Sequence, residues 1–193
     1  MRLAAVRRGR TLVDRLRLAY LRLRTGELGT DFDNTMRYRP DLFGSPFGAY
    51  VQAVRSHSGE WTIGEQQLFA TVASQMLKCQ FCMSVHREGA VREMPPAVVD
   101  AVLEDWRSAP IPERLKAVIG LYEKLTDAPS DLGPDDIAPL RAAGLSDAAI
   151  LEAVHIRTVF SIMTRVADAL GFEVPPAKVL QDRARRGRPD RTR

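Results

Sequence analysis

The stretch at positions 62–90, TIGEQQLFATVASQMLKCQFCMSVHREGA, decides the fold because it contains two helical patterns separated by a short break. Thr62 and Glu65 have the spacing of a capping box, in which each side chain bonds a backbone N–H near the helix start. We therefore expect one helix to run from this cap to about position 77. A second helix should follow over about 79–91.

Outside this stretch, nearly every segment also has helical periodicity, and no run alternates with the period of a β-strand. The sequence therefore predicts an all-α fold, a helical bundle with short connections. Segments 62–90 and 146–170 share a capped, apolar pattern, which favours a duplicated helical unit. The Pro- and Gly-rich segment 40–46 is expected to be a loop, as is the break at 57–59. Further helices are expected at 11–24, 47–55, 97–106, 112–125, 134–143 and 147–170, with a short one after 177.

The length of 193 residues suits a single domain. We expect one all-helical domain over 1–177, with a basic N-terminal helix within 1–30, and a basic C-terminal tail over 178–193. The helix at 11–24 is amphipathic and rich in arginine. Such a helix can lie on a membrane surface or bind a partner, but the commoner outcome is a packed first helix of the bundle.

Charge is distributed unevenly along the chain. Residues 1–24 carry a net charge of +7 and residues 178–193 carry +5, so 25–177 carries −8 of the overall +4. An acidic middle argues against nucleic-acid binding, which requires a basic face on the fold itself. No apolar run reaches the length of about 20 residues that a membrane span needs, and the N-terminus lacks the apolar segment of a secretory signal.

The chain has only two cysteines, and they stand three residues apart. A structural disulfide framework would use more cysteines, spread along the chain. An isolated close pair is typical of an intracellular protein that uses its thiols chemically, so we expect a cytoplasmic location.

The chemistry is expected in Cys79-x-x-Cys82-x-x-x-His86. On a helix these three residues lie on one face, because their separations are three and four positions. A helix start favours the thiolate over the thiol, and Lys78 adds positive charge nearby. An activated thiolate, a second thiol and a base together form a thiol redox centre.

Other interpretations of these residues stay open. A zinc site needs about four ligands, so only His57 or His155 could complete it. Covalent haem attachment requires a histidine directly after the second cysteine, where Met83 stands, and a thioredoxin site requires strands, which the pattern lacks. Two buried cysteines can also be plain core residues. Met83 is a candidate for an apolar pocket, and His155 for either the active site or the core.

Residues 64–90 resemble the signature of the AhpD-like alkylhydroperoxidases, within the carboxymuconolactone decarboxylase superfamily. The segments RPDLFGSPFGAYV (39–51) and LGPDDIAPLRAAGLSDAAILEAVHIRTVFSIMTRVADALGFE (132–173) resemble its peroxidase-related subgroup. The resemblance implies an all-α fold, assembly into trimers or hexamers, and reduction of peroxides by a redox-active disulfide with no metal or organic cofactor.

The resemblance also implies roles for individual residues. Cys82 would attack the peroxide, Cys79 would close the disulfide, and His86 would belong to a proton relay. An external dithiol, such as a lipoyl-bearing or thioredoxin-like protein, would reduce the pair again. The family usually has a glutamate where this chain has Gln67, and an amide cannot take up a proton near neutral pH. Phe81 occupies a pocket position that is aromatic in relatives.

The sequence therefore predicts a thiol peroxidase for organic or hydrogen peroxide. Three alternatives remain: a disulfide redox switch with slow turnover, a lactone decarboxylase of the same superfamily, and a helical interaction module that uses the basic N-terminal helix.

Overall fold

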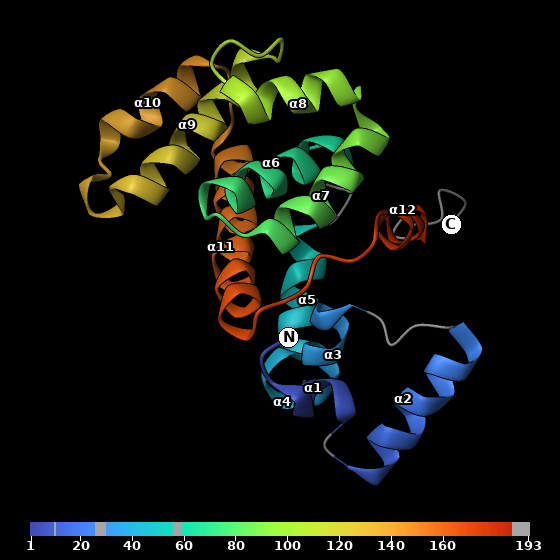
Figure 1. The fold of residues 1–193 in the computed structure, drawn as a ribbon. Helices are drawn as coiled ribbons and strands as arrows, with labels where there is room; N and C mark the ends of the chain where they lie inside the picture. The colour runs from blue at the N-terminus through green and yellow to red at the C-terminus, as the bar shows by residue number, and fades with distance from the viewer. Residues whose placement is uncertain (10, 26–29, 56–58, 187–193) are drawn as a thin grey trace.

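The computed structural model describes residues 1–9, 11–25, 30–55 and 59–186, and in these ranges the chain is helical with no strand (Figure 1). The predicted all-α class is therefore confirmed. A short 3-10 turn at Pro129–Asp131 separates two of the helices. The helices are α1 (Ala4–Arg8), α2 (Leu12–Thr25), α3 (Asp31–Tyr38), α4 (Pro40–Phe43), α5 (Ser45–Val54), α6 (Ile63–Met76), α7 (Gln80–Glu93), α8 (Pro96–Asp105), α9 (Glu113–Asp127), α10 (Pro134–Ala142), α11 (Asp147–Leu170) and α12 (Ala177–Arg186).

The antiparallel pair α6 and α7 forms the centre of the molecule. The predicted capping box is present, since Thr62 accepts from the N–H of Glu65 while the Glu65 carboxylate accepts from the N–H of Thr62. Gly64 lets the two helices approach closely, because a Cβ there would lie 3.1 Å from the side chains of Glu93 and Met94. The start of α6 is thereby fixed against the end of α7.

A Schellman motif ends α6 and sets the first cysteine in place. The N–H of Cys79 donates to the carbonyl of Ser74 over 2.9 Å, and the N–H of Lys78 donates to Gln75 over 2.9 Å. Lys78 takes the left-handed position that glycine usually fills, with φ of 59°. Cys79 is therefore both the residue that closes α6 and the N-cap of α7.

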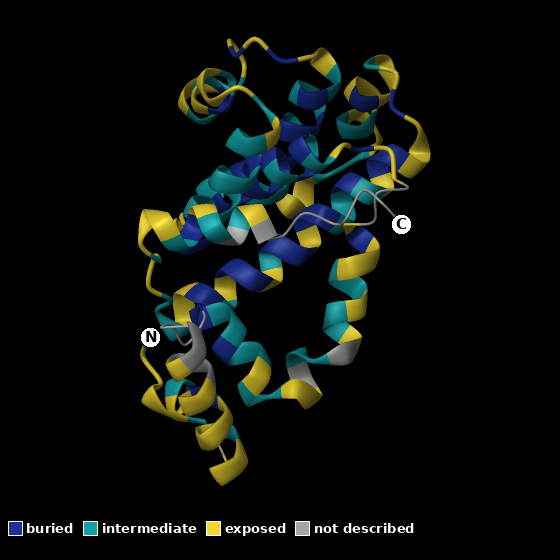
Figure 2. Ribbon diagram, turned by 90° about the vertical axis from the view of Figure 1, so that its right-hand side faces the viewer, coloured by how far each residue is buried: buried dark blue, intermediate teal, exposed yellow. Residues whose placement is uncertain are grey.

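The long helix α11 packs across α6 and completes the core. It starts at the Ser146 cap and stops at Gly171, whose φ of 61° is left-handed. Two buried side chains of other elements bond its backbone: Trp61 Nε1 donates to Ala149 over 3.0 Å, and the Tyr122 hydroxyl donates to Ala153 over 2.6 Å. Buried residues accordingly run through the middle of the bundle (Figure 2).

A buried carboxylate joins the N-terminal helices to the end of α11. Asp31 accepts two hydrogen bonds from the Arg7 guanidinium, over 2.8 and 2.9 Å, and one from the Glu173 N–H over 3.0 Å. Burial alone would raise the pKa of Asp31, but these hydrogen bonds lower it below its usual value. The ionised carboxylate therefore links α1, α3 and the chain after α11.

Several sequence predictions need correction. Segment 40–46 is helical, because Pro40 and Pro46 stand in the first turns of α4 and α5, where proline needs no hydrogen-bond donor. The duplicated unit is absent from the described residues, since 62–90 forms two helices whereas 146–170 is one uninterrupted helix. Two short helices, α1 and α3, were not predicted, although Thr30 and Asp33 form a capping box at α3. The break at 57–59 lies largely outside the described residues.

The short helix expected after position 177 is present as α12. It runs to position 186 within the segment predicted as a basic tail, and it packs on α7. Leu180 is buried, and the Arg92 guanidinium donates to the carbonyl of Ala184. The bundle therefore includes this segment as a structural element.

Candidate active site

A cavity of about 450 Å³ lies among α3, α5, α6, α7, α11 and α12. Helix α7 lines it with one continuous face, because the contributing positions recur at separations of three and four. Helices α6 and α11 present the same kind of stripe from two other sides. From α7 these positions are Phe81, Cys82, Val85, His86, Gly89, Arg92 and Glu93; from α6 they are Ile63, Gln66, Gln67 and Ala70; from α11 they are Ile156, Val159, Phe160 and Met163.

Most of the remaining wall is apolar and comes from segments far away in the sequence. Phe32 of α3 and three residues of α5 close one side, and Leu180 and Ala184 of α12 close another. Arg55, Arg92 and Glu93 are the charged residues among the lining. The cavity is thus a mainly apolar chamber with a few charged groups.

The two cysteines lie against this chamber at the start of α7. Cys79 is 1% exposed and Cys82 is 4% exposed, both are free thiols, and they approach each other to 3.5 Å. Cys82 lines the cavity, whereas Cys79 is not among the lining residues. Both belong to a small apolar cluster with Phe81 and Ala167. An oxidant in the chamber therefore meets Cys82 first, with Cys79 close behind it.

The surroundings of the two thiols push their acidities apart. The Cys82 thiol donates to Cys79, and this hydrogen bond, helped by the backbone N–H of Cys82, lowers the pKa of Cys79 despite its burial. The same contact with Cys79, followed by burial, raises the pKa of Cys82. Asp168, near the end of α11, acts on both cysteines in the raising direction. The sequence predicted activation of both thiols at the helix start, but in the reduced pair the charge is favoured on Cys79.

His86 and Gln67 meet across the α6–α7 interface. The Gln67 Oε1 lies 2.8 Å from the His86 Nδ1, so the ring donates its Nδ1 proton to the amide oxygen. The ring also packs edge-on against Phe160, with centroids 4.6 Å apart. A Cβ on Gly89 would lie 2.6 Å from the Gln67 Oε1, so glycine keeps open the space through which Gln67 reaches the histidine.

The predicted pocket residues divide into two groups. Phe81 lines the cavity and packs edge-on against Phe172, with centroids 5.1 Å apart. Met83 and His155 are not among the residues that line this cavity. Met83 lies one position beyond Cys82, which turns it about 100° around the helix. His155 instead accepts or donates a hydrogen bond with the Tyr50 hydroxyl, 2.8 Å away.

Sequence reasoning missed most of the chamber wall, including Phe32, Val51 and Leu180. The stripes on α6 and α11 were visible as helical periodicity, but that signal fits a core face equally well. Only the position of the cavity shows whether such a helix face lines the site or packs in the core.

No group of three or more His, Cys, Asp or Glu side chains within the described residues is arranged to hold a metal ion. Cys79, Cys82 and His86 therefore do not form such a group here, and His155 is engaged with Tyr50. His57, the other candidate fourth ligand, lies outside the described residues.

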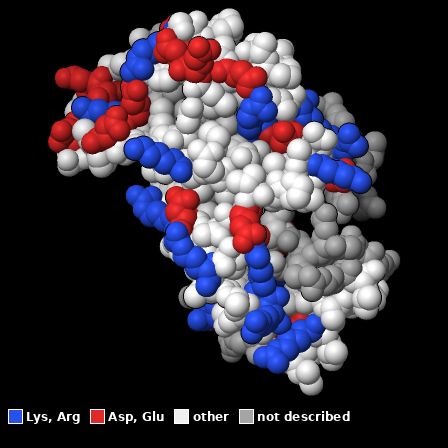
Figure 3. All heavy atoms as spheres, in the orientation of Figure 1, with Lys and Arg blue, Asp and Glu red and all other residues white. Residues whose placement is uncertain are grey.

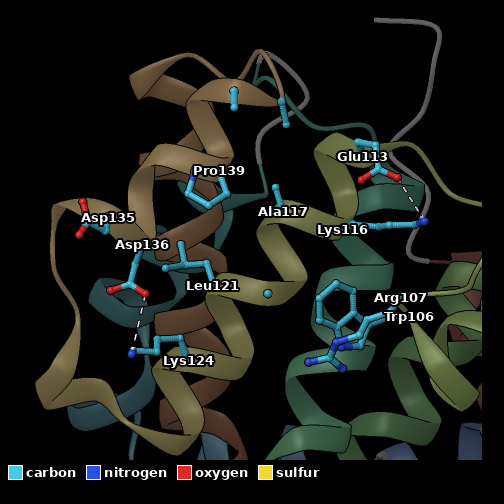
Figure 4. Close-up of a pocket in the computed structure, with 13 residues that line it drawn as sticks. Trp106, Arg107, Glu113, Lys116, Ala117, Leu121, Lys124, Asp135, Asp136 and Pro139 are labelled. Atoms are coloured by element: carbon cyan, nitrogen blue, oxygen red, sulfur yellow. Dashed lines mark ion pairs between the residues drawn. The ribbon is translucent and has the colours of Figure 1, made fainter.

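A second hollow lies between α9 and α10 and has a volume of about 850 Å³ (Figure 4). Ion pairs stand at its edges, with Lys116 bound to Glu113 over 3.2 Å and Lys124 bound to Asp136 over 3.9 Å. Neither cysteine lines this hollow. The cysteine cavity is therefore the candidate active site.

In the described part of the chain, no helix is both long and apolar enough to cross a membrane.

Fold and site together define a class: all-α proteins that hold a close cysteine pair at a helix start, beside a histidine and an apolar chamber. No family model and no curated protein matches the chain. Among solved structures, an AhpD-core, uncharacterized peroxidase-related protein from Ralstonia eutropha JMP134 superposes with a TM-score of 0.71 and 26% identity, over 86% of both chains.

Two further structures share the fold at lower identity. A peroxidase-related protein from Silicibacter sp. TM1040 superposes with a TM-score of 0.71 and 19% identity, over 86% of this chain and 85% of that one. The debrominase Bmp8, solved in complex with 2,3,4-tribromopyrrole, superposes with a TM-score of 0.70 and 19% identity, over 91% and 95%. The chain is a member of the AhpD-like superfamily.

Proposed function

We propose that this protein is a thiol-dependent peroxidase that reduces an organic hydroperoxide with Cys82 and Cys79, assisted by His86. The observation that carries the proposal is the position of Cys82. It faces the chamber together with His86, while a second thiol lies 3.5 Å from it. A peroxidase of this type needs these three groups in contact, since each acts in a successive step.

The first step consumes the peroxide. Cys82 loses its proton to His86, one helical turn away, and the thiolate attacks the outer oxygen of ROOH. The S–O bond forms as the O–O bond breaks, and His86 returns the proton to the departing alkoxide. The products are ROH and the sulfenic acid of Cys82. Gln67 holds the Nδ1 proton of the ring, so the other ring nitrogen, Nε2, is the one that exchanges a proton.

The second step closes the disulfide. Cys79 loses its proton and its thiolate attacks the Cys82 sulfur, so that the S–S bond forms and the S–O bond breaks. The hydroxide that leaves takes up the proton lost by Cys79 and departs as water. An external dithiol then reduces the disulfide and becomes oxidised itself, so that each cycle consumes one peroxide and one dithiol.

The chamber supports an organic substrate over hydrogen peroxide. Its volume of about 450 Å³ is within the range of small-molecule sites, and its walls include Phe32, Phe160 and Leu180. Hydrogen peroxide would leave most of this apolar surface uncovered. An apolar R group would cover it, and the burial would favour binding by about 25 cal/mol per Å².

The test is peroxide consumption by the dithiol-reduced protein, with cumene hydroperoxide and hydrogen peroxide compared, in the presence of excess dihydrolipoamide. Cys82→Ser should abolish turnover. Cys79→Ser should still react once and accumulate a sulfenic acid, which dimedone traps and mass spectrometry detects. The proposal predicts sustained turnover for the wild type and a preference for the organic peroxide.

Two results would contradict it. Wild-type protein that loses two thiols once and then stops, despite excess dithiol, would be a disulfide switch. If dimedone instead labels Cys82→Ser at Cys79, the roles of the two cysteines are reversed, and the acidity of Cys79 outweighs the better access of Cys82.

A further inference from the structure

The helix α2 exposes an apolar stripe to solvent. Leu12, Val13, Leu16, Tyr20 and Leu23 have exposed fractions between 57% and 88%. The expected packing of this helix into the bundle is therefore wrong for most of its apolar residues, because only Leu18 among those described is buried. Helix α2 extends away from the helices that enclose the cavity (Figure 1).

The stripe has a regular geometry and basic borders. At 100° per residue, its five members fall within an arc of about 100° of the helix. Arg15 lies about 60° beyond one border and Arg17 about 40° beyond the other, and both are exposed. Leu18 lies on the opposite side. The helix thus has an apolar face flanked by cations, which is the pattern of helices that lie in a lipid interface.

The net charge of the chain around α2 is positive, like that of Arg15 and Arg17. Residues 1–24 carry a net charge of +7. On the face drawn in Figure 3, Lys and Arg gather over the lower half, which holds α1 to α5, whereas Asp and Glu gather over α9 and α10. An occupant of the stripe must therefore be apolar in its middle and anionic at its borders.

Pairing of two α2 stripes alone would bury too little surface to be stable. A helix of 14 residues is about 21 Å long, so a stripe about 10 Å wide covers roughly 200 Å², against about 800 Å² per partner in a stable interface. Pairing two such stripes would also bring Arg15 and Arg17 of both copies together. A lipid surface has neither restriction, because an amphipathic helix enters it by about 5–10 Å while anionic headgroups surround the cations.

We propose that α2 is a peripheral membrane-binding helix that lies in an anionic lipid surface, with the stripe of Leu12, Val13, Leu16, Tyr20 and Leu23 buried and with Arg15 and Arg17 at the headgroups. None of these residues lines the cavity, so the proposed membrane binding does not use the residues of the peroxidase site. It would bring the apolar chamber close to a surface that holds apolar compounds.

The test is co-sedimentation of the full chain with vesicles of phosphatidylcholine alone, and of phosphatidylcholine with phosphatidylglycerol, at low and high salt. The protein should bind the anionic vesicles and be released by salt. Arg15→Ala with Arg17→Ala should weaken binding roughly thirtyfold, since each cation near an anionic surface contributes severalfold. Leu16→Gln with Leu23→Gln should weaken it by at least about a hundredfold.

Matched controls come from exposed residues elsewhere. Leu151→Gln replaces a leucine that is 58% exposed on α11, and Arg141→Ala removes an exposed arginine of α10; neither should change vesicle binding. The mass of each variant is measured by sedimentation velocity. The proposal is overturned if the wild type ignores anionic vesicles, or if the leucine pair changes the assembly mass and leaves vesicle binding as it was.

Discussion

Replacing Gln67 by glutamate should speed the reaction of Cys82 with an organic hydroperoxide by about tenfold. In the proposed first step, His86 becomes positively charged when it takes the proton of Cys82. The group that it faces, 2.8 Å away, is the neutral amide oxygen of Gln67. A carboxylate in the same place stabilises the charged ring, so a larger fraction of Cys82 exists as thiolate.

The magnitude follows from the change in one hydrogen bond. A neutral hydrogen bond contributes about 1 kcal/mol net, whereas a bond to a charged group contributes about 1.5–3 kcal/mol. The difference is about 0.5–2 kcal/mol, and the middle of this range corresponds to roughly tenfold in rate. Glutamate has nearly the size and shape of glutamine, so the contact between α6 and α7 should persist.

The assay is the single-turnover loss of thiols after reduced protein is mixed with excess cumene hydroperoxide, followed over a range of pH. Gln67→Met is the matched control, because it keeps the side-chain length and removes the hydrogen bond; it should be slower than the wild type. The same Gln67→Glu change is then made in a His86→Asn background.

The double variant provides the refuting result. If the glutamate acts through His86, its benefit disappears when the histidine is absent. A tenfold gain that persists in the His86→Asn background would mean that the carboxylate acts on the cysteines or the peroxide directly. Equal rates for glutamate, glutamine and methionine at position 67 would remove this side chain from the mechanism.

Gly89→Ala should slow the same reaction by about tenfold, because the new Cβ displaces the Gln67 amide from its present position, while urea unfolding should show a stability change of no more than about 1 kcal/mol. The contact with Cys82 lowers the pKa of Cys79 and the Asp168 carboxylate opposes this, so Asp168→Asn should shift the pH profile of iodoacetamide alkylation to lower pH; an unchanged profile would contradict this role. Tyr122→Phe should destabilise the protein by about 0.5–1.5 kcal/mol in urea unfolding, since the buried Ala153 carbonyl of α11 loses one donor and keeps its bond within the helix.

The sequence predicted the parts of this protein that depend on near neighbours. Thr62 and Glu65 defined the start of α6, and the spacing from Cys79 to His86 placed the thiols on one helix. These features arise within one or two helical turns, where the periodicity and the capping rules apply directly. The resemblance to a known family identified Gln67 as a site residue. It lies 19 positions before His86, the histidine that it contacts.

The chamber was beyond sequence reasoning because its walls come from distant segments. Phe32 and Leu180 are nearly 150 positions apart, yet both line it. The difference in pKa between the thiols of Cys79 and Cys82 was also not predicted. A helix start alone favours thiolates, but the contact with Cys79, followed by burial, raises the pKa of Cys82. The part that burial contributes depends on how the helices pack, and no local pattern encodes it.

The position of α12 in the chain has a consequence for biosynthesis. A ribosome releases α6 and α7, with both thiols, about 90 residues before it releases Leu180 and Ala184. During that interval the nascent chain has its cysteine pair but lacks the chamber wall from α12 and, at first, the wall from α11 as well. The cysteine pair is therefore synthesised well before the walls that would select a substrate by its shape.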